Sequence, residues 1–267
     1  MSVEHLEGND LIKNKKEALL ANAAFVKLAN GFKVYQDLLH DEKNQDQREE
    51  IKQRMLELWT PNPRSETEDD NTERVAFRET IDLVNFAMDE CENNFYNLES
   101  FAEKLASLSA ADFLLEEWTG EAGKIKKTGE GDVRYIHVNE MITYSSEKDG
   151  EISLEIKPFG AEGGRFMGEF HDGLRIIAQQ LESGQIKADG IIMVSWLFSR
   201  EKITKRFLGK GVVSEDDNSE EGKESQCVAL KYDNKVLKKY LETGEKPEVK
   251  RVTMTKDEFI ARFLKNN

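Results

Sequence analysis

A glycine-rich segment near the middle of the chain has the residue types to bind an anion. Residues 159–164 read FGAEGG after Pro158, and a helix-like segment begins at Arg165. The first backbone N–H groups of a helix have no intrahelical partner and carry a partial positive charge. Flexible backbone without side chains lets a ligand approach them, and Arg165 adds a cation there. The spacing therefore predicts an anion site at this helix start.

Two histidines are candidates for acid–base chemistry or metal ligation. His171 and Asp172 follow Glu169, but neighbouring residues in a helix point in different directions, and no second His/Cys cluster completes a coordination sphere. A solvated or capping role is the favoured interpretation, and no metal is predicted. His137 lies in a strand-like stretch without a partner nearby in sequence. A hydrogen-bonded strand histidine is favoured over a catalytic base.

The possible nucleophiles lack the sequence contexts that usually activate them. Ser195 has no G-x-S-x-G context, so a buried strand hydroxyl is expected. Cys91 and Cys227 are the only cysteines, and they imply no disulfide framework. Two buried, reduced thiols are expected, with one reactive thiol as the alternative. The chain has no P-loop or dinucleotide fingerprint either, so the catalytic residues stay unassigned.

A longer stretch places the glycine-rich segment in a recognisable order of elements. It reads LEIKPFGAEGGRFMGEFHDGLRIIAQQL and then GIIMVSWLFSREKITKRFLGKGV, from Leu154 to Val212. This stretch resembles the cofactor-binding half of the GNAT-type N-acetyltransferases. In that family a strand ends in an apolar-x-Pro step, a glycine-bearing loop opens a helix that binds the acyl-CoA pyrophosphate, and a second strand and helix follow. The resemblance implies acyl-CoA as the cofactor. Its implied binding residues are Gly163, Gly164, Arg165 and Gly168.

The stretch also departs from the family pattern. Ala161 occupies the position of a basic or amide residue, and Phe166 replaces a small one. Gly211 is kept, but Val212 replaces the phenylalanine that follows it. Phe207 stands where the family has the tyrosine that protonates the leaving thiolate, and a phenyl ring has no proton to donate. The resemblance therefore implies an acyl-CoA-binding fold that is degenerate in N-acyltransferase catalysis.

The glycines divide the chain into two parts. All but two of the 18 glycines lie at or after Gly120, and glycine is costly inside helices but useful in turns and at strand ends. The chain is therefore predicted to be α+β, with a helical bundle followed by a mixed α/β, GNAT-like domain. The predicted bounds are 1–118 for the bundle, 119–131 for a linker and 132–267 for the α/β domain. Within the latter, the acidic segment 214–226 is predicted to be a flexible, solvated loop.

Apolar periodicity predicts the helices of the first domain. Residues three and four positions apart share a helix face, and such stripes predict four helices packed as an antiparallel bundle. The helices are expected from Asn9 to about His40, around Ile51–Trp59 up to Pro61, over 77–105, and from Ser109 to Trp118.

Alternation and turn residues predict the second domain. Residues 133–148 fit a strand or a helix, while Asp149-Gly150 indicates a hairpin turn before a strand at 152–156. The remaining order is helix, strand, helix, strand, helix, strand and helix around a central sheet. These elements are expected at 165–183, 190–198, 199–207, 227–232, 234–242, 249–255 and 256–264.

The charge composition disfavours two classes of binding partner. Against 38 basic residues the chain has 52 acidic ones, a net charge of −14, which opposes binding to nucleic acid or anionic lipid. No apolar run approaches the roughly 20 residues that span a bilayer, so a cytoplasmic protein is expected. The alternative to an acyl-CoA-binding protein is a non-catalytic adaptor or scaffold that binds a protein partner through its helical bundle. The oligomeric state is left open.

Overall fold

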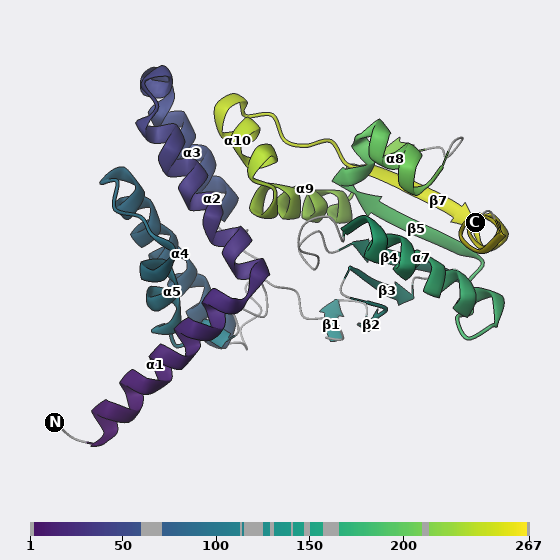
Figure 1. Cartoon of the computed structure of the whole chain (residues 1–267), viewed down its shortest axis with the longest axis horizontal. Coiled ribbons are helices and arrows are strands. Elements are labelled where there is room, and N and C mark those ends of the chain that lie inside the picture. The colour runs from purple at the N-terminus through teal and green to yellow at the C-terminus, as the bar shows by residue number, and fades with distance from the viewer. Residues whose placement is uncertain are drawn as a thin grey trace. The chain divides into compact units, whose positions relative to one another are not determined.

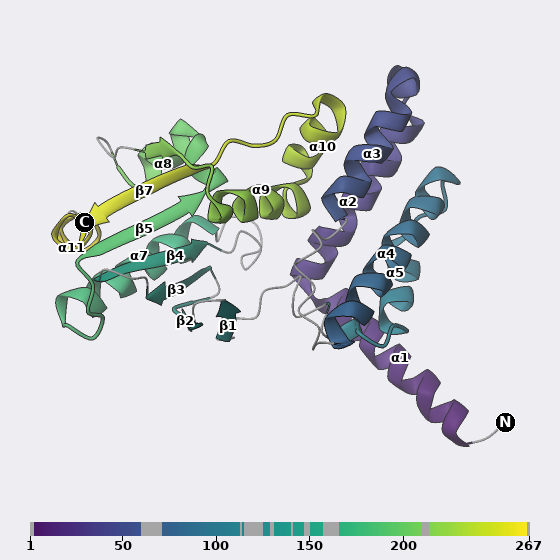
Figure 2. The ribbon, with the colours of Figure 1, turned by 180° about the vertical axis from the view of Figure 1, so that it is seen from behind.

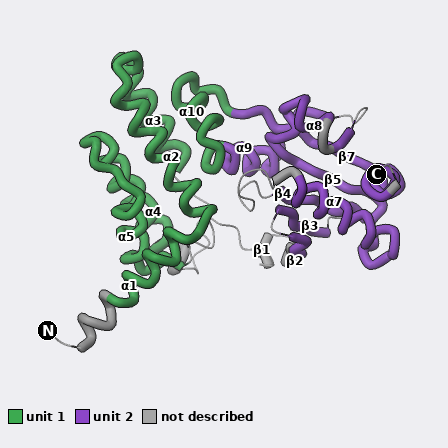
Figure 3. Tube along the Cα trace, viewed as in Figure 1, with its two compact units in different colours: residues 1–120, 230–246 green, residues 121–229, 247–267 purple. Residues whose placement is uncertain are grey.

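The structure of the protein, a computed structural model, combines helices with a mixed β-sheet and divides into two compact units (Figure 3). The helical unit comprises residues 1–120 and 230–246, and the sheet unit comprises residues 121–229 and 247–267. The expected α+β composition is confirmed. The residues that the structure describes are 3–59, 71–112, 114, 125–128, 131–139, 141–146, 150–156, 166–209 and 214–265.

The helical unit consists of helices in the first half of the chain and one from near its end (Figures 1 and 2). Its elements are α1 (Val3–Ala21), α2 (Ala23–His40), the 3-10 helix η1 (Glu42–Gln47), α3 (Arg48–Trp59), α4 (Asn71–Glu92), α5 (Leu98–Ala106) and α10 (Asn234–Thr243). The helix expected around Ile51–Trp59 is confirmed as α3.

The single helix expected from Asn9 to His40 is wrong, because the chain breaks at Asn22. This residue has an extended conformation, and its side-chain oxygen accepts a hydrogen bond from the backbone N–H of Phe25 at 3.0 Å. Asparagine is a preferred N-cap because this bond satisfies one of the unpaired donors of the helix start. Asn22 therefore begins α2 as a separate helix after α1.

The long helix expected over 77–105 is also wrong. Helix α4 ends at Glu92, and Asn94 takes a left-handed conformation with φ 62°, which asparagine tolerates better than most residues. Asn97 then caps α5 by accepting a hydrogen bond from the N–H of Ser100 at 2.7 Å. The apolar stripe does not survive the break, because Phe95 is 74% exposed.

An aromatic cluster forms the centre of the helical unit. The ring of Phe32 in α2 lies 5.3 Å from that of Trp59, 5.7 Å from that of Tyr96 and 5.2 Å from that of Phe101. Phe32 and Phe101 have no exposed surface. The same core includes Leu237, Tyr240 and Leu241 of α10. Residues 230–246, expected in the second domain, thus pack within the helical unit.

In the described part of the sheet unit, seven strands are arranged in the order β1-β2-β3-β4-β5-β7-β6. Neighbours are antiparallel except for β4 and β5, which are parallel and joined by α7. The strands are β1 (Ile125–Thr128), β2 (Gly131–His137), β3 (Ile142–Ser146), β4 (Glu151–Ile156), β5 (Gly190–Ser195), β6 (Ser214–Asp216) and β7 (Lys250–Thr255). The helices are α7 (Phe166–Glu182), η4 (Trp196–Ser199, 3-10), α8 (Glu201–Phe207), α9 (Glu220–Tyr232, whose last residues belong to the helical unit), α11 (Lys256–Ile260) and η5 (Ala261–Lys265).

The ambiguous stretch 133–148 is resolved as strands β2 and β3. Gly150 has φ 77° and precedes β4, which pairs antiparallel with β3. The predicted hairpin is therefore confirmed, although Asp149 lies outside the described residues. Strand β1 falls within the segment interpreted as a linker, and it pairs with β2.

One face of the sheet is apolar and is covered by helices. Ile152, Leu154 and Met193 share a core with Phe170 and Leu174 of α7. Because side chains alternate along a strand, Ser153 and Glu155 point to the opposite face. Helix α9 lies on that face, since the Ser153 hydroxyl donates to Glu221 Oε1 at 3.2 Å.

Two expectations for the acidic region are wrong. Residues 214–226 form β6 and the start of α9 instead of a solvated loop, and CVALKY at 227–232 is the end of α9 instead of a strand. Acidic residues in the first turn of a helix interact favourably with its dipole, which accounts for a helix beginning in an acidic segment. The expectation of two buried thiols is wrong for Cys227, which is exposed on α9. Cys91 is buried and donates to the Phe32 carbonyl at 3.3 Å. Burial raises the pKa of Cys91 to about 12.

None of the helices in the described part of the chain is both long and apolar enough to cross a bilayer.

Candidate functional site

The parallel strands β4 and β5 stop pairing with each other before either strand ends, and this loss of pairing is called their separation. Their pairing ends at Leu154 and Met193. Beyond this point β4 continues to pair with β3 as far as Ile156, and β5 continues to pair with β7 as far as Ser195. In open α/β sheets, ligands bind outside the carboxyl ends of such parallel strands. The separation therefore marks a candidate ligand site.

Helix α7 brings its N-terminus to the same end of the sheet. It connects two parallel strands, so it must run back along the sheet and begin beside the carboxyl end of β4. Gly168 is in its first turn and is exposed, and a Cβ atom added there would meet no atom within 4 Å. Gly163, Gly164 and Arg165 lie outside the described residues. The structure thus places one of the four predicted binding residues at a helix N-terminus open to a ligand.

The turn between β2 and β3 fixes the start of α7 against the sheet. The Asn139 side chain donates to the carbonyl of Glu169 at 2.7 Å, and its oxygen accepts from the N–H groups of Met141 and Ile142. A Cβ atom at Gly173 would lie 2.9 Å from this amide nitrogen, so glycine is needed for the close approach. The position of the candidate anion site is therefore determined by packing in the sheet unit.

The end of β5 is held by hydroxyl groups. The Ser195 hydroxyl accepts from the N–H of Leu197 at 3.2 Å, and the Ser225 hydroxyl accepts from the N–H of Trp196 at 3.1 Å. Ser195 is buried, as expected of a strand hydroxyl. The Arg200 guanidinium lies 4.7 Å from the Trp196 ring centre. These contacts give Ser195 a structural role in ending the strand.

Phe207 is the last residue of α8. Tyr232 and Tyr240 have hydroxyl groups that could donate a proton in its place, but both belong to the helical unit. Tyr240 is buried in the helical core. Burial raises the pKa of Tyr232 well above its usual value. Neither tyrosine belongs to the unit that holds the candidate site.

His171 and Asp172, the candidates for acid–base chemistry or metal ligation on α7, contact neighbouring side chains. His171 lies edge-on to Phe263 with ring centres 6.0 Å apart. Asp172 pairs with Arg175 one turn later in α7 at 3.6 Å. Among the described side chains, no group of three or more His, Cys, Asp or Glu residues is arranged to hold a metal ion.

The register of β2, β3 and β4 places in one row three residues that local sequence patterns do not bring together. His137 of β2 is opposite Thr143 of β3, which is opposite Glu155 of β4. Paired residues point to the same face of a sheet, so these three side chains form a row. The signal was available in the sequence, because the predicted hairpin at Gly150 together with alternation in ITYSS and EISLEI determines which residues of β3 and β4 share a face.

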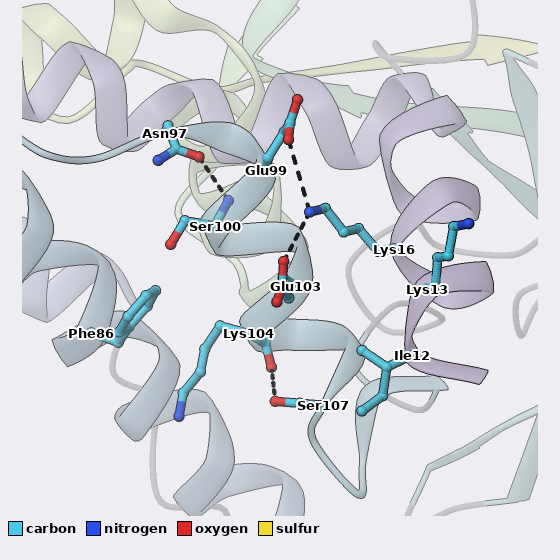
Figure 4. A pocket seen from close by; sticks show the side chains of 10 residues that line it. All are labelled: Ile12, Lys13, Lys16, Phe86, Asn97, Glu99, Ser100, Glu103, Lys104 and Ser107. Atoms are coloured by element: carbon cyan, nitrogen blue, oxygen red, sulfur yellow. Dashed lines mark hydrogen bonds and ion pairs between the residues drawn. The ribbon is translucent and has the colours of Figure 1, made fainter. Parts of the chain in front are cut away.

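A second concave surface lies in the helical unit. This groove has a volume of about 850 Å³. Its lining side chains come from α1, α4 and α5 (Figure 4). One of its lysines faces acidic neighbours: Lys16 of α1 lies 2.9 Å from Glu103 and 3.8 Å from Glu99. Lys104 lies 5.7 Å from the Phe86 ring centre. Because these pairs partly neutralise one another, the groove favours no ligand of definite charge.

Comparison with protein-family models, with curated proteins and with solved structures finds no significant match to this chain. The functional argument therefore depends on the residues and geometry of the sheet unit.

Proposed function

We propose that the sheet unit binds an acyl-CoA at the carboxyl ends of β4 and β5. The separation of these strands beyond Leu154 and Met193 is the observation that carries the proposal. It offers a slot for the extended pantetheine arm, while the start of α7 offers backbone N–H groups to the pyrophosphate. The order β4, α7, β5 and α8 is the strand, helix, strand and helix order of the GNAT resemblance, which supports a GNAT-like interpretation.

Catalysis by this unit is proposed to be slow. An amine that attacks a thioester releases a thiolate, and a positioned proton donor typically accelerates such steps by about a hundredfold or more. Phe207 cannot supply that proton. Tyr240 is buried in the core of the helical unit, and Tyr232 packs against that core. The proposed protein is therefore an acyl-CoA binder that is degenerate as an N-acyltransferase.

Gly168→Glu is expected to weaken acetyl-CoA binding about tenfold. An added side chain at residue 168 meets no neighbouring atom, so the fold should tolerate it. A carboxylate in the first turn is also favourable for α7, but it repels a phosphate bound there. Isothermal titration calorimetry with acetyl-CoA measures the change in Kd, and thermal unfolding of the free protein checks its stability.

Gln179→Glu is the matched control. It adds the same charge to an exposed position of α7 far from its N-terminus, so the affinity should stay within twofold of the original, about 0.4 kcal/mol. Equal weakening by both substitutions would attribute the effect to net charge and contradict the proposed position. Absence of acetyl-CoA binding at millimolar concentration would overturn the function itself.

A further inference from the structure

Helix α1 is held to the rest of the helical unit by few buried side chains. Among its described side chains, residues 10–21, only Leu19 is buried, whereas ten residues of α2 are buried. Ile12 and Leu20 are partly buried against the same core. Segments with few buried apolar contacts open locally at a lower free-energy cost than the core does. Helix α1 can therefore separate from the unit more easily than α2 can.

The polar contacts of α1 are surface ion pairs. Lys16 pairs with Glu99 and Glu103 of α5, and Lys15 pairs with Asp112 at 2.9 Å. The three acidic side chains are 64–78% exposed, so water and salt compete for these pairs and each contributes little to stability. The lysines and carboxylates nevertheless form one matched surface between α1 and α5. A second copy of the chain presents the same carboxylates to α1.

The connection between α1 and α2 is a single residue, Asn22. Its backbone is extended, with φ −84° and ψ 110°, and its side-chain oxygen accepts from the N–H of Phe25. The axis of α1 turns away from that of α2 at this point (Figures 1 and 2). The bend between the two helices is therefore made by one residue and its cap.

The sequence on both sides of Asn22 favours a continuous helix. The flanking residues EALLA and AAFVK are mostly strong helix formers, and no glycine or proline lies between Gly8 and Gly31 apart from these two glycines. A helical Asn22 lets the N–H groups of residues 23–25 bond to the carbonyls of residues 19–21. A straight form thus replaces the cap with backbone hydrogen bonds, and a change at one residue is enough to reach it.

We propose that straightening at Asn22 releases α1 from its own α5 and lets it pack on α5 of a second copy, which forms a domain-swapped dimer. Exchange of an identical element between two chains reuses contacts that already fit, so it needs no new complementary surface. In the dimer, Lys16 of each protomer pairs with Glu99 and Glu103 of the other. The exchange involves the helical unit alone and does not depend on the proposed acyl-CoA site.

Asn22→Ala is expected to raise the dimerisation constant of the full chain about twenty-fivefold, because loss of an N-cap changes a helix equilibrium about fivefold and the dimer contains two hinges. Sedimentation equilibrium over a range of protein concentrations measures this constant. Asn22→Asp keeps a capping side chain and should not raise it. Asn30→Ala removes an exposed asparagine within α2, away from the hinge, and should leave the constant within about twofold.

Cross-linking between two different chains tests the exchange itself. One chain carries Lys16→Cys and the other carries Glu103→Cys, both with Cys227→Ser, while Cys91 is buried. The chains are mixed at a concentration at which the dimer forms, and a short bismaleimide is added. The swap predicts covalent heterodimers joined between residues 16 and 103, identified by mass spectrometry, and more of them when both chains also carry Asn22→Ala.

Two results would overturn the proposal. One is a chain that stays monomeric with Asn22→Ala at millimolar concentration. The other is a dimer without a link between residues 16 and 103 of different chains, which would show that α1 remains on its own α5. A single chain with both cysteines, treated with the bismaleimide at low concentration, provides the reference for the link within one chain.

Discussion

Phe32→Ala is expected to lower the free energy of unfolding of the helical unit by about 3–5 kcal/mol. Phe32 has no exposed surface, and its ring contacts those of Trp59, Tyr96 and Phe101. Removing the ring forfeits its transfer free energy and leaves a cavity between three helices that cannot all move inward. The stability of the helical unit should therefore be highly sensitive to substitutions in this aromatic cluster.

Urea titration followed by circular dichroism measures the loss, and hydrogen exchange shows whether it is concentrated in α2, α3 and α5. Phe95→Ala is the matched control, because this phenylalanine is 74% exposed and its removal should change stability by no more than about 0.5 kcal/mol. Similar losses for the two variants would contradict the described core and the break between α4 and α5.

Asp217→Asn is expected to destabilise the sheet unit by about 2 kcal/mol. The Asp217 side chain is 3% exposed, and its oxygens accept from Arg251 Nε at 2.7 Å and from the N–H of Ser219 at 2.7 Å. The Ser219 hydroxyl also donates to it. Asparagine keeps the shape but presents an NH₂ group to a donor, which leaves buried hydrogen-bonding capacity unsatisfied.

The pKa of Asp217 determines how its contribution to stability depends on pH. Burial by itself raises the pKa of Asp217, but hydrogen bonds from Ser219 and Arg251 outweigh it and leave the pKa below the ordinary value. The folded-state pKa is thus lower than the unfolded one of about 3.9, so the stabilisation is complete above that pH and is lost as the pH falls through the folded-state pKa. The stability difference between the original protein and Asp217→Asn should therefore shrink below about pH 4.

Asp216→Asn is the control for this pair of measurements. Asp216 is its neighbour and pairs with Lys250 at 2.5 Å, but its side chain is 71% exposed. Water competes for such a pair, so little change is expected. A loss as large as that of Asp217→Asn, or a difference that grows on acidification, would contradict the buried network between β6, β7 and α9.

Helical content in the first part of the chain was predictable, but two of the predicted helices were wrong, because polar residues end helices within them. Cys91, Phe95 and Leu98 keep helical spacing, so periodicity alone continues through residues 93–97. The structure ends α4 there because Asn94 takes a left-handed conformation and Asn97 caps the next helix. The asparagines at these two positions indicate a helix end and a new helix start, but the continuous apolar stripe favoured a single helix in the prediction.

The secondary structure of residues 214–232 was wrongly predicted for a different reason. CVALKY is a short apolar run that fits a buried strand or a helix face, and periodicity over so few residues does not decide between them. The decision comes from tertiary contacts, in which Asp217 binds Arg251 and Glu221 accepts from Ser153. These partners are distant in sequence, so local patterns do not contain the information.

The candidate site was predicted in part. The glycine-bearing helix start follows from local sequence, and Gly168 is found in the first turn of α7. The separation of β4 from β5 depends on the extra pairing of each strand with its other neighbour, which sequence patterns do not reveal. His137 lacked a partner in sequence because Thr143 and Glu155 come into one row with it only through the sheet register.

The most direct test of the acyl-CoA site is a titration of ¹⁵N-labelled protein with CoA, followed residue by residue in amide correlation spectra. The proposed site predicts the largest shifts at residues 154–156, 166–169 and 193–196, where β4 and β5 separate and α7 begins. Shifts confined to the groove between α1, α4 and α5, or an unchanged spectrum at millimolar CoA, would contradict it.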